Sequence, residues 1–460
     1  MAGIGFELRK LVERDDLLGV AEGYGYAALA ASGPWLFTIL SLAVIFLLGT
    51  PSNSPGELAI FRIVIVYNFS FSLVLTAPGA IVMTRYLADS IHAKDVHEVP
   101  ASLLGGLMLA YAVSAPVAAF FYIGRAHLDG PTRAAALLNF LLIAGIWLVS
   151  VFLTALKDYR ALTVSFGVGM LLGTAGAAIL SIPWAVAGML HGFNLGLAVI
   201  LFSLTARVFA EFPTRPSHPL AFLPYFRTHW ELALAALAYN LAIWADKWLM
   251  WMAPEREILS IGLVSCPVYE SAMFLAYLSV VPSMAAFTVS IETGFFEKYA
   301  RFYDDIQRHV AYSRIEANHR DLIQSFLDGA RNFVVLQGSL CVVGILAAPR
   351  LFEWIGIDFA QLGIFRLGLL GAFFHSGFLF LLIFLAYFDL RRIMLSLAAL
   401  FLAANTLLTL ATLRLGFPYY GYGYFLSALI AFAAAFLATD YFIRRLPYQT
   451  FIRNNSSVAQ

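Results

Sequence analysis

The chain has 460 residues, of which 61% are apolar and only 12% are charged. Soluble domains carry about 45–50% apolar and about 25% charged residues, so this composition excludes a protein whose whole surface faces water. The formal net charge of +1 shows no acidic or basic excess that would indicate a nucleic-acid partner.

Twelve apolar stretches are long enough to cross a bilayer as helices, because a hydrocarbon core of roughly 30 Å requires about 20 apolar residues. Their approximate bounds are 24–49, 58–86, 101–124, 133–155, 161–181, 183–208, 229–252, 260–291, 330–348, 361–387, 392–412 and 419–442. The turn between the fifth and sixth stretches is marked only by Ser181, Ile182 and Pro183. The first stretch is longer than a signal-peptide core and no cleavage motif follows it, so we expect it to stay in the protein.

These stretches predict an all-α polytopic membrane protein with two six-helix halves. The predicted parts are a cytoplasmic amphipathic helix at 1–23, an N-terminal half at 24–208, a cytoplasmic linker at 209–228, a C-terminal half at 229–443 with a cytoplasmic amphipathic loop at 292–329, and a cytoplasmic tail at 444–460.

The positive charges support this count of helices. If the N-terminus is cytoplasmic, 21 of the 29 Lys and Arg residues lie on the inside, five lie outside and three fall within spans. This excess on one side is what the positive-inside rule requires. We therefore expect a multi-pass protein of the inner membrane with both termini in the cytoplasm.

Prolines within the spans mark candidate hinges. Pro78 and Pro282 each lie in the second helix of their half, and each is followed six residues later by a threonine. Together with Pro34 in the first helix, they free backbone carbonyls at positions where a helix can bend. The matching positions indicate a weak parallel repeat of the two halves, which is a common plan among transporters.

Five ionisable residues are predicted to share the outer half of the bilayer, and they are Arg62, Asp246, Lys247, Glu270 and Arg366. Each would cost roughly 2.5–3.5 kcal/mol if it faced lipid, so residues of mixed sign at one depth indicate a water-filled cavity. The alternative is that Lys247 reaches the interface beside its neighbouring tryptophans, and that the two arginines do likewise from helix ends.

Neutral polar and aromatic residues in the spans extend this candidate cavity. To the ionisable residues we add Asn240, His375, Tyr67 and Tyr269, since ring faces suit sugars and polar tips can bond hydroxyls. Other members of the same classes are Asn68, Asn139, Asn194, Asn405 and Tyr277. The alternative interpretation is ordinary interhelical hydrogen bonding or core packing. Gly169 and Gly173 form a small-residue motif suited to close helix packing.

The loop after the eighth span contains an amphipathic helix. Phe295, Tyr299, Phe302, Ile306 and Val310 follow one another at steps of three or four. Such a helix either rests on the membrane or the bundle, or it binds a cytoplasmic enzyme. For the second case the candidate docking residues are Lys298, Arg301, Phe302 and Ile306.

No hydrolase, kinase or nucleotide-binding motif occurs in the sequence. The two cysteines, Cys266 and Cys341, lie in apolar runs and form no metal cluster. We therefore expect no catalytic residues, no metal and no cofactor.

The N-terminal sequence carries a family resemblance. The segment MAGIGFELRKL at 1–11, Tyr24-Gly25-Tyr26-Ala27 and Ser32-Gly33-Pro34-Trp35 resemble the start of the Pel exopolysaccharide inner-membrane transporter family, PelG. Chain length, helix number and the long inner loop are similar as well. The resemblance implies a distant member of the flippase and multidrug exporter superfamily, in which two six-helix halves enclose a central cavity.

The resemblance also implies partners and a substrate. These are a cytoplasmic glycosyltransferase that makes an N-acetylgalactosamine-type polymer, and two further inner-membrane Pel components, one of which senses cyclic di-GMP. No family motif fixes the cavity residues of this sequence, so the residues named above rest on topology and burial cost alone.

We therefore expect a non-enzymatic exporter that moves an exopolysaccharide across the inner membrane for a biofilm matrix. One alternative is a cation-coupled small-molecule or drug antiporter of the same superfamily. Others are a membrane-embedded glycosyltransferase, which the short outer loops disfavour, and a scaffold that recruits the synthase through 292–329. The sequence does not choose between an ion gradient and polymer elongation as the energy source.

Overall fold

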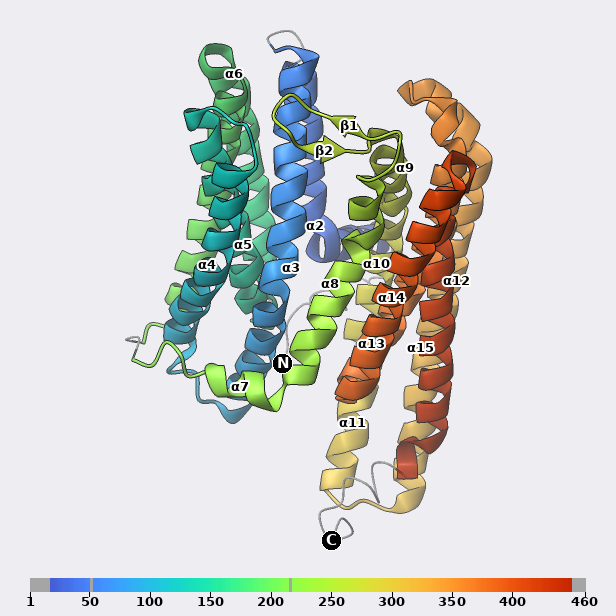
Figure 1. Cartoon of the computed structure of the whole chain (residues 1–460). Coiled ribbons are helices and arrows are strands. Elements are labelled where there is room, and N and C mark those ends of the chain that lie inside the picture. The colour runs from blue at the N-terminus through green and yellow to red at the C-terminus, as the bar shows by residue number, and fades with distance from the viewer. Residues whose placement is uncertain (1–16, 50–52, 157, 215–216, 449–460) are drawn as a thin grey trace. The chain divides into compact units, whose positions relative to one another are not determined.

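The computed structural model describes residues 17–49, 53–156, 158–214 and 217–448, and helices make up most of them (Figure 1). The predicted N-terminal amphipathic helix as far as residue 16 and the tail beyond Tyr448 lie outside these residues. The same holds for the segment at 1–11 that carries most of the family resemblance.

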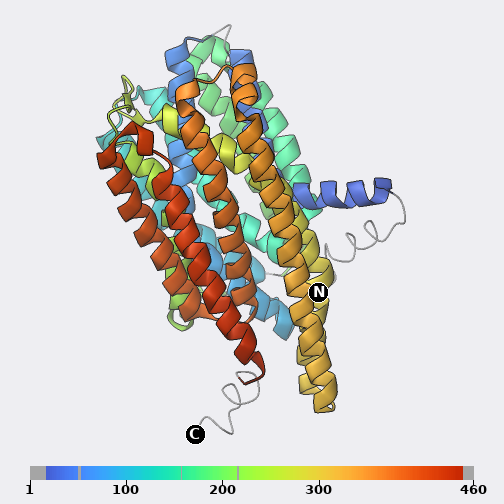
Figure 2. The ribbon, with the colours of Figure 1, turned by 90° about the vertical axis from the view of Figure 1, so that its right-hand side faces the viewer.

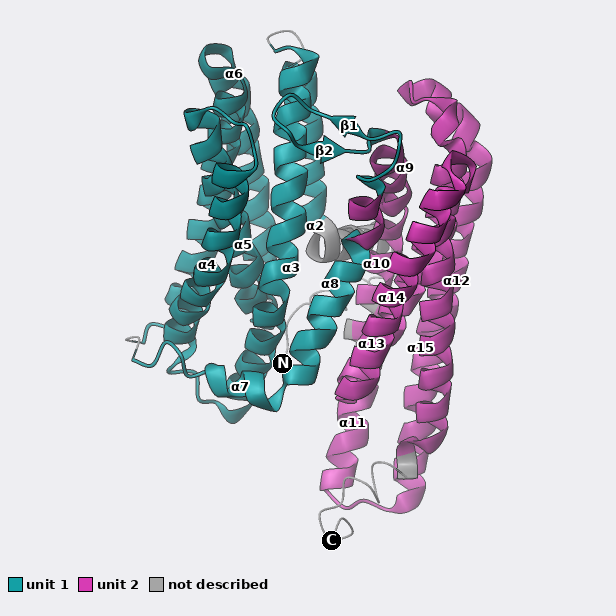
Figure 3. Ribbon diagram, in the orientation of Figure 1, with its two compact units in different colours: residues 1–7, 28–244, 250–267 teal, residues 8–27, 245–249, 268–460 magenta. Residues whose placement is uncertain are grey.

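The chain divides into two compact units (Figure 3). Unit 1 comprises the described residues within 28–244 and 250–267, and unit 2 comprises those within 17–27, 245–249 and 268–448. The division of the chain at a linker, 209–228, stays a prediction.

Unit 1 is a bundle of helices with one short hairpin. Its elements are most of α2 (Leu17–Gly49), α3 (Pro55–Ala93), α4 (Val99–Gly124), α5 (Gly130–Ala155), α6 (Tyr159–Glu211), α7 (Leu223–Thr228), most of α8 (Trp230–Met250), β1 (Glu257–Ile258) and β2 (Val264–Ser265). Helix α5 packs against α3, α4 and α6. The core of the unit includes Phe61, Phe152 and Phe193, which are all at most 1% exposed.

Side chains at the first turns fix where several of these helices begin. Ser54 accepts from the backbone N–H of Glu57 while the Glu57 carboxylate accepts from the backbone N–H of Ser54, which is a complete capping box. Asp129 and Asp158 accept backbone N–H groups at the starts of α5 and α6.

Helix α6 is two helical segments joined at Ala185, whose backbone has φ 43° and ψ −124°. Pro183 lies two residues earlier and cannot donate a helical hydrogen bond, which confirms the turn expected from the sequence at this point. A side chain at Gly192 would overlap the backbone of Gly176 and Ala177, and one at Gly196 would overlap Gly169 and Gly173. The two segments therefore run antiparallel in direct backbone contact, and the close packing predicted for Gly169 and Gly173 is confirmed.

Unit 2 is built mainly from the remaining long helices. Its elements are α9 (Pro267–Leu278), α10 (Val280–Ser290), a π-helix (Ile291–Phe295), α11 (Phe296–Gln307), α12 (Tyr312–Ile355), a 3-10 turn (Phe359–Gln361), α13 (Leu362–Tyr387), α14 (Arg391–Leu415), a second 3-10 turn (Phe417–Tyr419) and α15 (Tyr422–Tyr448). Helix α13 packs against α12 and α15, and α14 packs against α15. Figure 2 shows α11 alongside the first part of the much longer α12.

The described residues account for the predicted number of spans. Nine helices are long and apolar enough to cross a membrane, and one of them is the bent α6, which supplies two segments. Gly33–Gly49 is a shorter apolar helix, and the 21-residue α8, which contains Asp246 and Lys247, coincides with the predicted span at 229–252 and brings the number to twelve. The all-α polytopic fold with about twelve transmembrane helices is thus confirmed.

Two boundaries differ from those expected. The predicted eighth span begins at Pro267 rather than at 260, because the strands β1 and β2 occupy the preceding residues. The predicted loop at 292–329 is almost wholly helical, since α10 continues through the π-helix into α11 and α12 begins at Tyr312. Apolarity marks where lipid begins, and it does not mark where a helix ends.

Candidate functional site

A buried ion pair lies within unit 2. Asp246 is 0% exposed and Lys247 is 9% exposed, and the Lys247 ammonium donates to both carboxylate oxygens of Asp246 at 2.9 and 3.0 Å. Both residues belong to α8. Burying either charge alone is very costly, so each requires the other.

Two neutral donors from other helices complete the surroundings of the Asp246 carboxylate. The Tyr269 hydroxyl on α9 donates to it at 2.8 Å, and the Asn405 amide on α14 donates at 3.3 Å. Asn405 in turn accepts from the hydroxyl of Thr409. Hydrogen bonds to a buried carboxylate offset part of the cost of removing it from water.

Two aromatic rings face the ammonium. The Nζ atom of Lys247 lies 4.9 Å from the ring centroid of Tyr277 and 5.3 Å from that of Tyr424. Both distances are within the roughly 6 Å over which a ring face attracts a cation. The hydroxyl of Tyr424 is 2.9 Å from Nδ1 of His375, which is 6% exposed. We call this set the ion-pair cluster, and its members are Asp246, Lys247, Tyr269, Tyr277, His375, Asn405 and Tyr424.

Four of the nine predicted cavity residues belong to the ion-pair cluster, namely Asp246, Lys247, Tyr269 and His375. The alternative that Lys247 reaches the lipid interface does not fit its position, because its ammonium is held by a fully buried carboxylate. From the sequence, Asn405 and Tyr277 are only members of the polar and aromatic classes within the spans, and Tyr424 is not predicted as a site residue. Tyr277 lies eight residues after Tyr269, which places both on one side of a helix, and this spacing was the available signal.

The other predicted cavity residues lie elsewhere. Arg62 and Arg366 are half-buried, and Nε of Arg366 has no hydrogen-bond partner in the described part of the chain. Glu270 is also half-buried, and it lies in the first turn of α9 rather than ten residues into a span. A carboxylate is favourable there because the helix N-terminus carries a partial positive charge.

Asn240 and Tyr67 belong to unit 1 and bond within it. The Asn240 amide donates to the carbonyl of Ala236 in its own helix at 2.8 Å. The Tyr67 hydroxyl donates to the carbonyl of Val264 at 2.8 Å, and its ring stacks on Trp251 with centroids 4.3 Å apart. Tyr67 therefore fixes strand β2 to α3.

The buried amides of unit 1 form a separate network. Tyr122 donates to Asn68 at 2.6 Å, Asn68 donates to Asn139 at 2.8 Å, and Asn139 donates to Asn194 at 2.7 Å. Asn194 closes the series by donating to the carbonyl of Ala135. The network links α3, α4, α5 and α6 through neutral groups, as expected for interhelical hydrogen bonds.

The predicted hinge prolines lie in three different helices. Pro34 and Pro78 are inside α2 and α3, which continue through them. Pro282 follows a break between α9 and α10, because it cannot donate to the carbonyl of Leu278, the last residue of α9. The fully buried side chain of Gln337 on α12 lies at this break. It accepts a hydrogen bond from the Ser283 hydroxyl and donates one to the Ser279 hydroxyl.

The apolar stripe that begins at the end of the π-helix and continues along α11 packs within unit 2. Phe295 is 1% exposed and its ring contacts Phe326, Phe384 and Tyr387. Phe302, one of the four candidate docking residues, is also 1% exposed. Of the other three, Arg301 is exposed, and Lys298 and Ile306 are half-buried.

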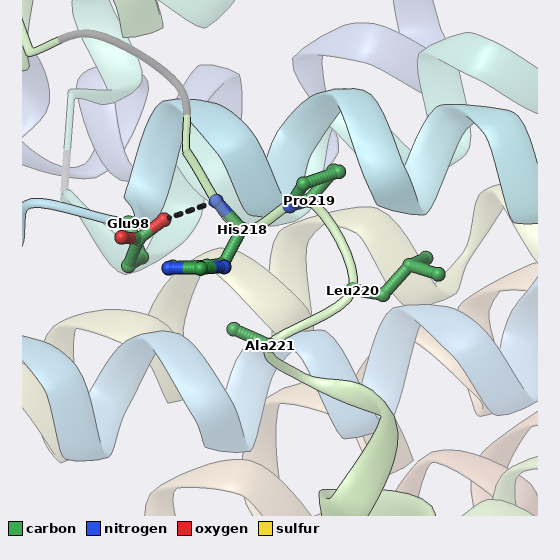
Figure 4. Close-up of a pocket in the computed structure, with 5 residues that line it drawn as sticks. All are labelled: Glu98, His218, Pro219, Leu220 and Ala221. Carbon is green, nitrogen blue, oxygen red and sulfur yellow. Dashed lines mark hydrogen bonds between the residues drawn. The ribbon is translucent and has the colours of Figure 1, made fainter.

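A pocket lies where the predicted linker meets the start of α4, lined by Glu98, His218, Pro219, Leu220 and Ala221 (Figure 4). The Glu98 carboxylate accepts from the hydroxyl of Ser217 and, at 2.9 Å, from the backbone N–H of His218. These hydrogen bonds hold the pKa of Glu98 below its ordinary value. A side chain at Gly105 would overlap the carbonyl of Pro219, so this glycine lets the linker lie directly on α4.

No group of three or more His, Cys, Asp or Glu residues that could hold a metal ion occurs within the described ranges. Both cysteines, Cys266 and Cys341, are buried.

Solved structures with a similar fold include transporters. The chain superposes on an outward-facing multidrug resistance MATE family transporter of the MOP superfamily with a TM-score of 0.65, at 15% identity, over 96% of this chain and 98% of that one. A MOP superfamily transporter from Pyrococcus furiosus gives a TM-score of 0.62 at 14% identity, over 97% of each chain. The protein thus has the fold of the MOP superfamily transporters.

The family match is more specific. Residues 1–451 match PelG, described as an exopolysaccharide exporter (EPS-E). The protein belongs to the PelG family, and the resemblance stated from its first 35 residues is confirmed. No curated protein matches the chain.

Proposed function

We propose that this protein exports a Pel-type, N-acetylgalactosamine-rich exopolysaccharide from a cytoplasmic glycosyltransferase to the periplasm, as a non-enzymatic transporter of the inner membrane. The observation that carries the proposal is the PelG family match over residues 1–451. The fold of a MOP superfamily transporter supports transport as the activity.

The proposed route uses the half-buried charged residues rather than the ion-pair cluster. Arg62, Glu270 and Arg366 are partly exposed, whereas Asp246 is sealed against its lysine. Nε of Arg366 is buried and has no hydrogen-bond partner among the residues described, so any contact with a sugar hydroxyl would come from the exposed part of its guanidinium. Charged groups in a membrane are retained where they border water, and a passing polymer would require such a border.

The test of the proposal is to delete the gene for this protein and to measure whether the polymer is inside the cells or secreted. We expect the polymer to accumulate inside cells whose synthase remains active, and we expect the intact protein to restore secretion. If the polymer is absent although the isolated synthase works, the protein assembles the synthase instead of transporting its product.

A drug antiporter is the second candidate, because the matched structures include a multidrug resistance transporter. Polymer secretion and drug tolerance of variant strains distinguish the two functions. An exporter variant with altered cavity residues changes polymer secretion, whereas an antiporter variant changes drug tolerance. A deletion strain that secretes normally and becomes drug-sensitive would replace our proposal with this one.

We predict that Glu270→Ala and Arg366→Ala each reduce secretion at unchanged abundance in the membrane. Removing a charged contact made during passage weakens binding of the polymer by about 1.5–3 kcal/mol, which corresponds to at least a tenfold effect. Arg350→Ala is the matched control, because the Arg350 side chain is 90% exposed and pairs only at 3.8 Å with Glu353. Normal secretion by both test variants would remove these residues from the route.

The proposed contact with the glycosyltransferase uses the polar face of α11. Phe302 packs inside unit 2, so the contact rests on Arg301, Lys298 and the accessible part of Ile306. We predict that Lys298→Glu with Arg301→Glu weakens co-purification with the synthase. Arg444→Glu is the control, since Arg444 is an exposed arginine on α15 and pairs with Asp440. Equal co-purification of all variants would retire the docking proposal.

A further inference from the structure

The ion-pair cluster has the composition of a site for a small monovalent cation. It offers a fully buried carboxylate, the hydroxyl of Tyr269 bonded to that carboxylate, and the ring faces of Tyr277 and Tyr424 at 4.9 and 5.3 Å from the bound charge. Carboxylate and hydroxyl oxygens are ligands for hard cations, and ring faces attract any cation. The cation in the structure is the ammonium of Lys247.

A buried carboxylate in a membrane protein must be neutralised by a proton, an ion or a charged side chain. Here the ammonium contacts both oxygens of Asp246 at 2.9 and 3.0 Å. The side chains of Tyr269, Tyr277, Asn405 and Tyr424 supply no second formal charge. One carboxylate and one ammonium thus make the pair electrically neutral.

Covalent attachment favours the ammonium over ions from solution. Lys247 is the residue next to Asp246 on α8, so its side chain reaches the carboxylate without any motion of the backbone. A tethered group acts at a high effective concentration, commonly in the millimolar range or above. A free cation must compete with that concentration and must also shed its water.

We propose that Asp246, Tyr269, Tyr277 and Tyr424 form a monovalent-cation site that is permanently filled by Lys247 in the native protein. Native unit 2 therefore does not exchange Na⁺ or K⁺ at Asp246. Once the ammonium is removed, the same cage takes up a Na⁺ or K⁺ ion in its place. This inference is independent of the polymer that the protein moves.

The experiment measures the midpoint of thermal unfolding of the purified full-length protein in NaCl, KCl and N-methyl-D-glucamine chloride at equal ionic strength. We expect the midpoint of the native protein to be the same in the three salts. Lys247→Ala should have a lower midpoint in N-methyl-D-glucamine chloride, and NaCl or KCl should raise it saturably by about 3 °C or more.

The matched control removes the carboxylate as well. Asp246→Asn combined with Lys247→Ala keeps the space and loses the negative charge, so its midpoint should not respond to the choice of cation. A response of the native protein to Na⁺ or K⁺ would overturn the proposal. Equal responses of the single and double variants would overturn it too.

The Lys247→Ala variant can give two further results. If its midpoint rises on acidification and ignores Na⁺ and K⁺, a proton neutralises the carboxylate and no cation site exists. If the variant does not accumulate in the membrane, the salt series on the native protein still decides whether the site exchanges cations. Recovery of accumulation in the double variant would then support mutual neutralisation of the two residues.

Discussion

The side chains around Asp246 show how a membrane protein keeps a carboxylate that no water reaches. The carboxylate has an ammonium and two neutral donors, and these come from α8, α9 and α14. Each donor removes part of the cost of burial. The loss of any one of them should therefore reduce stability more than the loss of an exposed hydroxyl.

We predict that Tyr269→Phe lowers stability by about 1–3 kcal/mol, because it removes one hydrogen bond from a buried charged acceptor and keeps the ring. The measurement is the midpoint of thermal unfolding in detergent. Tyr419→Phe is the control, since Tyr419 is 47% exposed. Similar midpoints for the two variants would show that the 2.8 Å bond to Asp246 contributes little.

The sequence identifies Asp246 and Lys247 as charged residues within a predicted span, but it does not predict which groups from other helices they contact. The cost of a charge in lipid identified Asp246 and Lys247 from the sequence. Neighbours in a helix point about 100° apart, and only the flexible lysine stem brings its ammonium back to the carboxylate. Tyr424 lies 178 positions after Asp246, and no local pattern indicates that its ring faces Lys247.

At the scale of elements, the bent helix α6 depends on glycine. The segments before and after Ala185 touch through Gly169, Gly173, Gly176, Gly192 and Gly196. Small residues allow backbones to approach in a membrane, where packing replaces the hydrophobic effect as the driving force. The sequence indicates Gly169, Gly173 and the proline, but only the structure shows that Gly192 and Gly196 lie on the facing segment.

We predict that Gly192→Ala destabilises the protein by about 1–3 kcal/mol, because the added methyl group overlaps the backbone of Gly176 and must separate the segments. Gly79→Ala is the control. No atom lies within 4 Å of the position of its added methyl group, and alanine favours a helix over glycine by up to about 1 kcal/mol. The two substitutions should thus shift the unfolding midpoint in opposite directions. A Gly192→Ala protein as stable as the native one would show that the segments separate without cost.

Helix lengths also explain why the predicted loop at 292–329 is helical beyond its amphipathic stretch. Helix α12 has 44 residues and is about 66 Å long, which is roughly twice the thickness of a hydrocarbon core. Its first turns are polar, and hydropathy assigns such turns to a loop. The amphipathic pattern of 295–310 nevertheless predicted α11 correctly, because its period reports helical geometry rather than the solvent.

For the whole molecule, the distribution of positive charge predicts the orientation in the membrane. With the N-terminus in the cytoplasm, 21 positive residues lie inside and five lie outside. Two of the residues counted as inside, Arg314 and Arg320, lie in the charged first part of α12.

We predict that single cysteines at Arg256 and Arg350 react with a membrane-impermeant maleimide in cells whose inner membrane is intact, and that cysteines at Arg301 and Arg320 react only after that membrane is permeabilised. All four side chains are exposed, so access from each side of the membrane is what differs among them. In the protein that carries these single cysteines, the native Cys266 and Cys341 are replaced. Both are buried, at 0% and 4% exposure. Each substitution lowers either the 21 positive residues inside or the five outside by only one, so the orientation should persist. Labelling of Arg301→Cys in intact cells together with protection of Arg256→Cys would reverse the topology, and the proposed contact of α11 with a cytoplasmic enzyme would then be impossible.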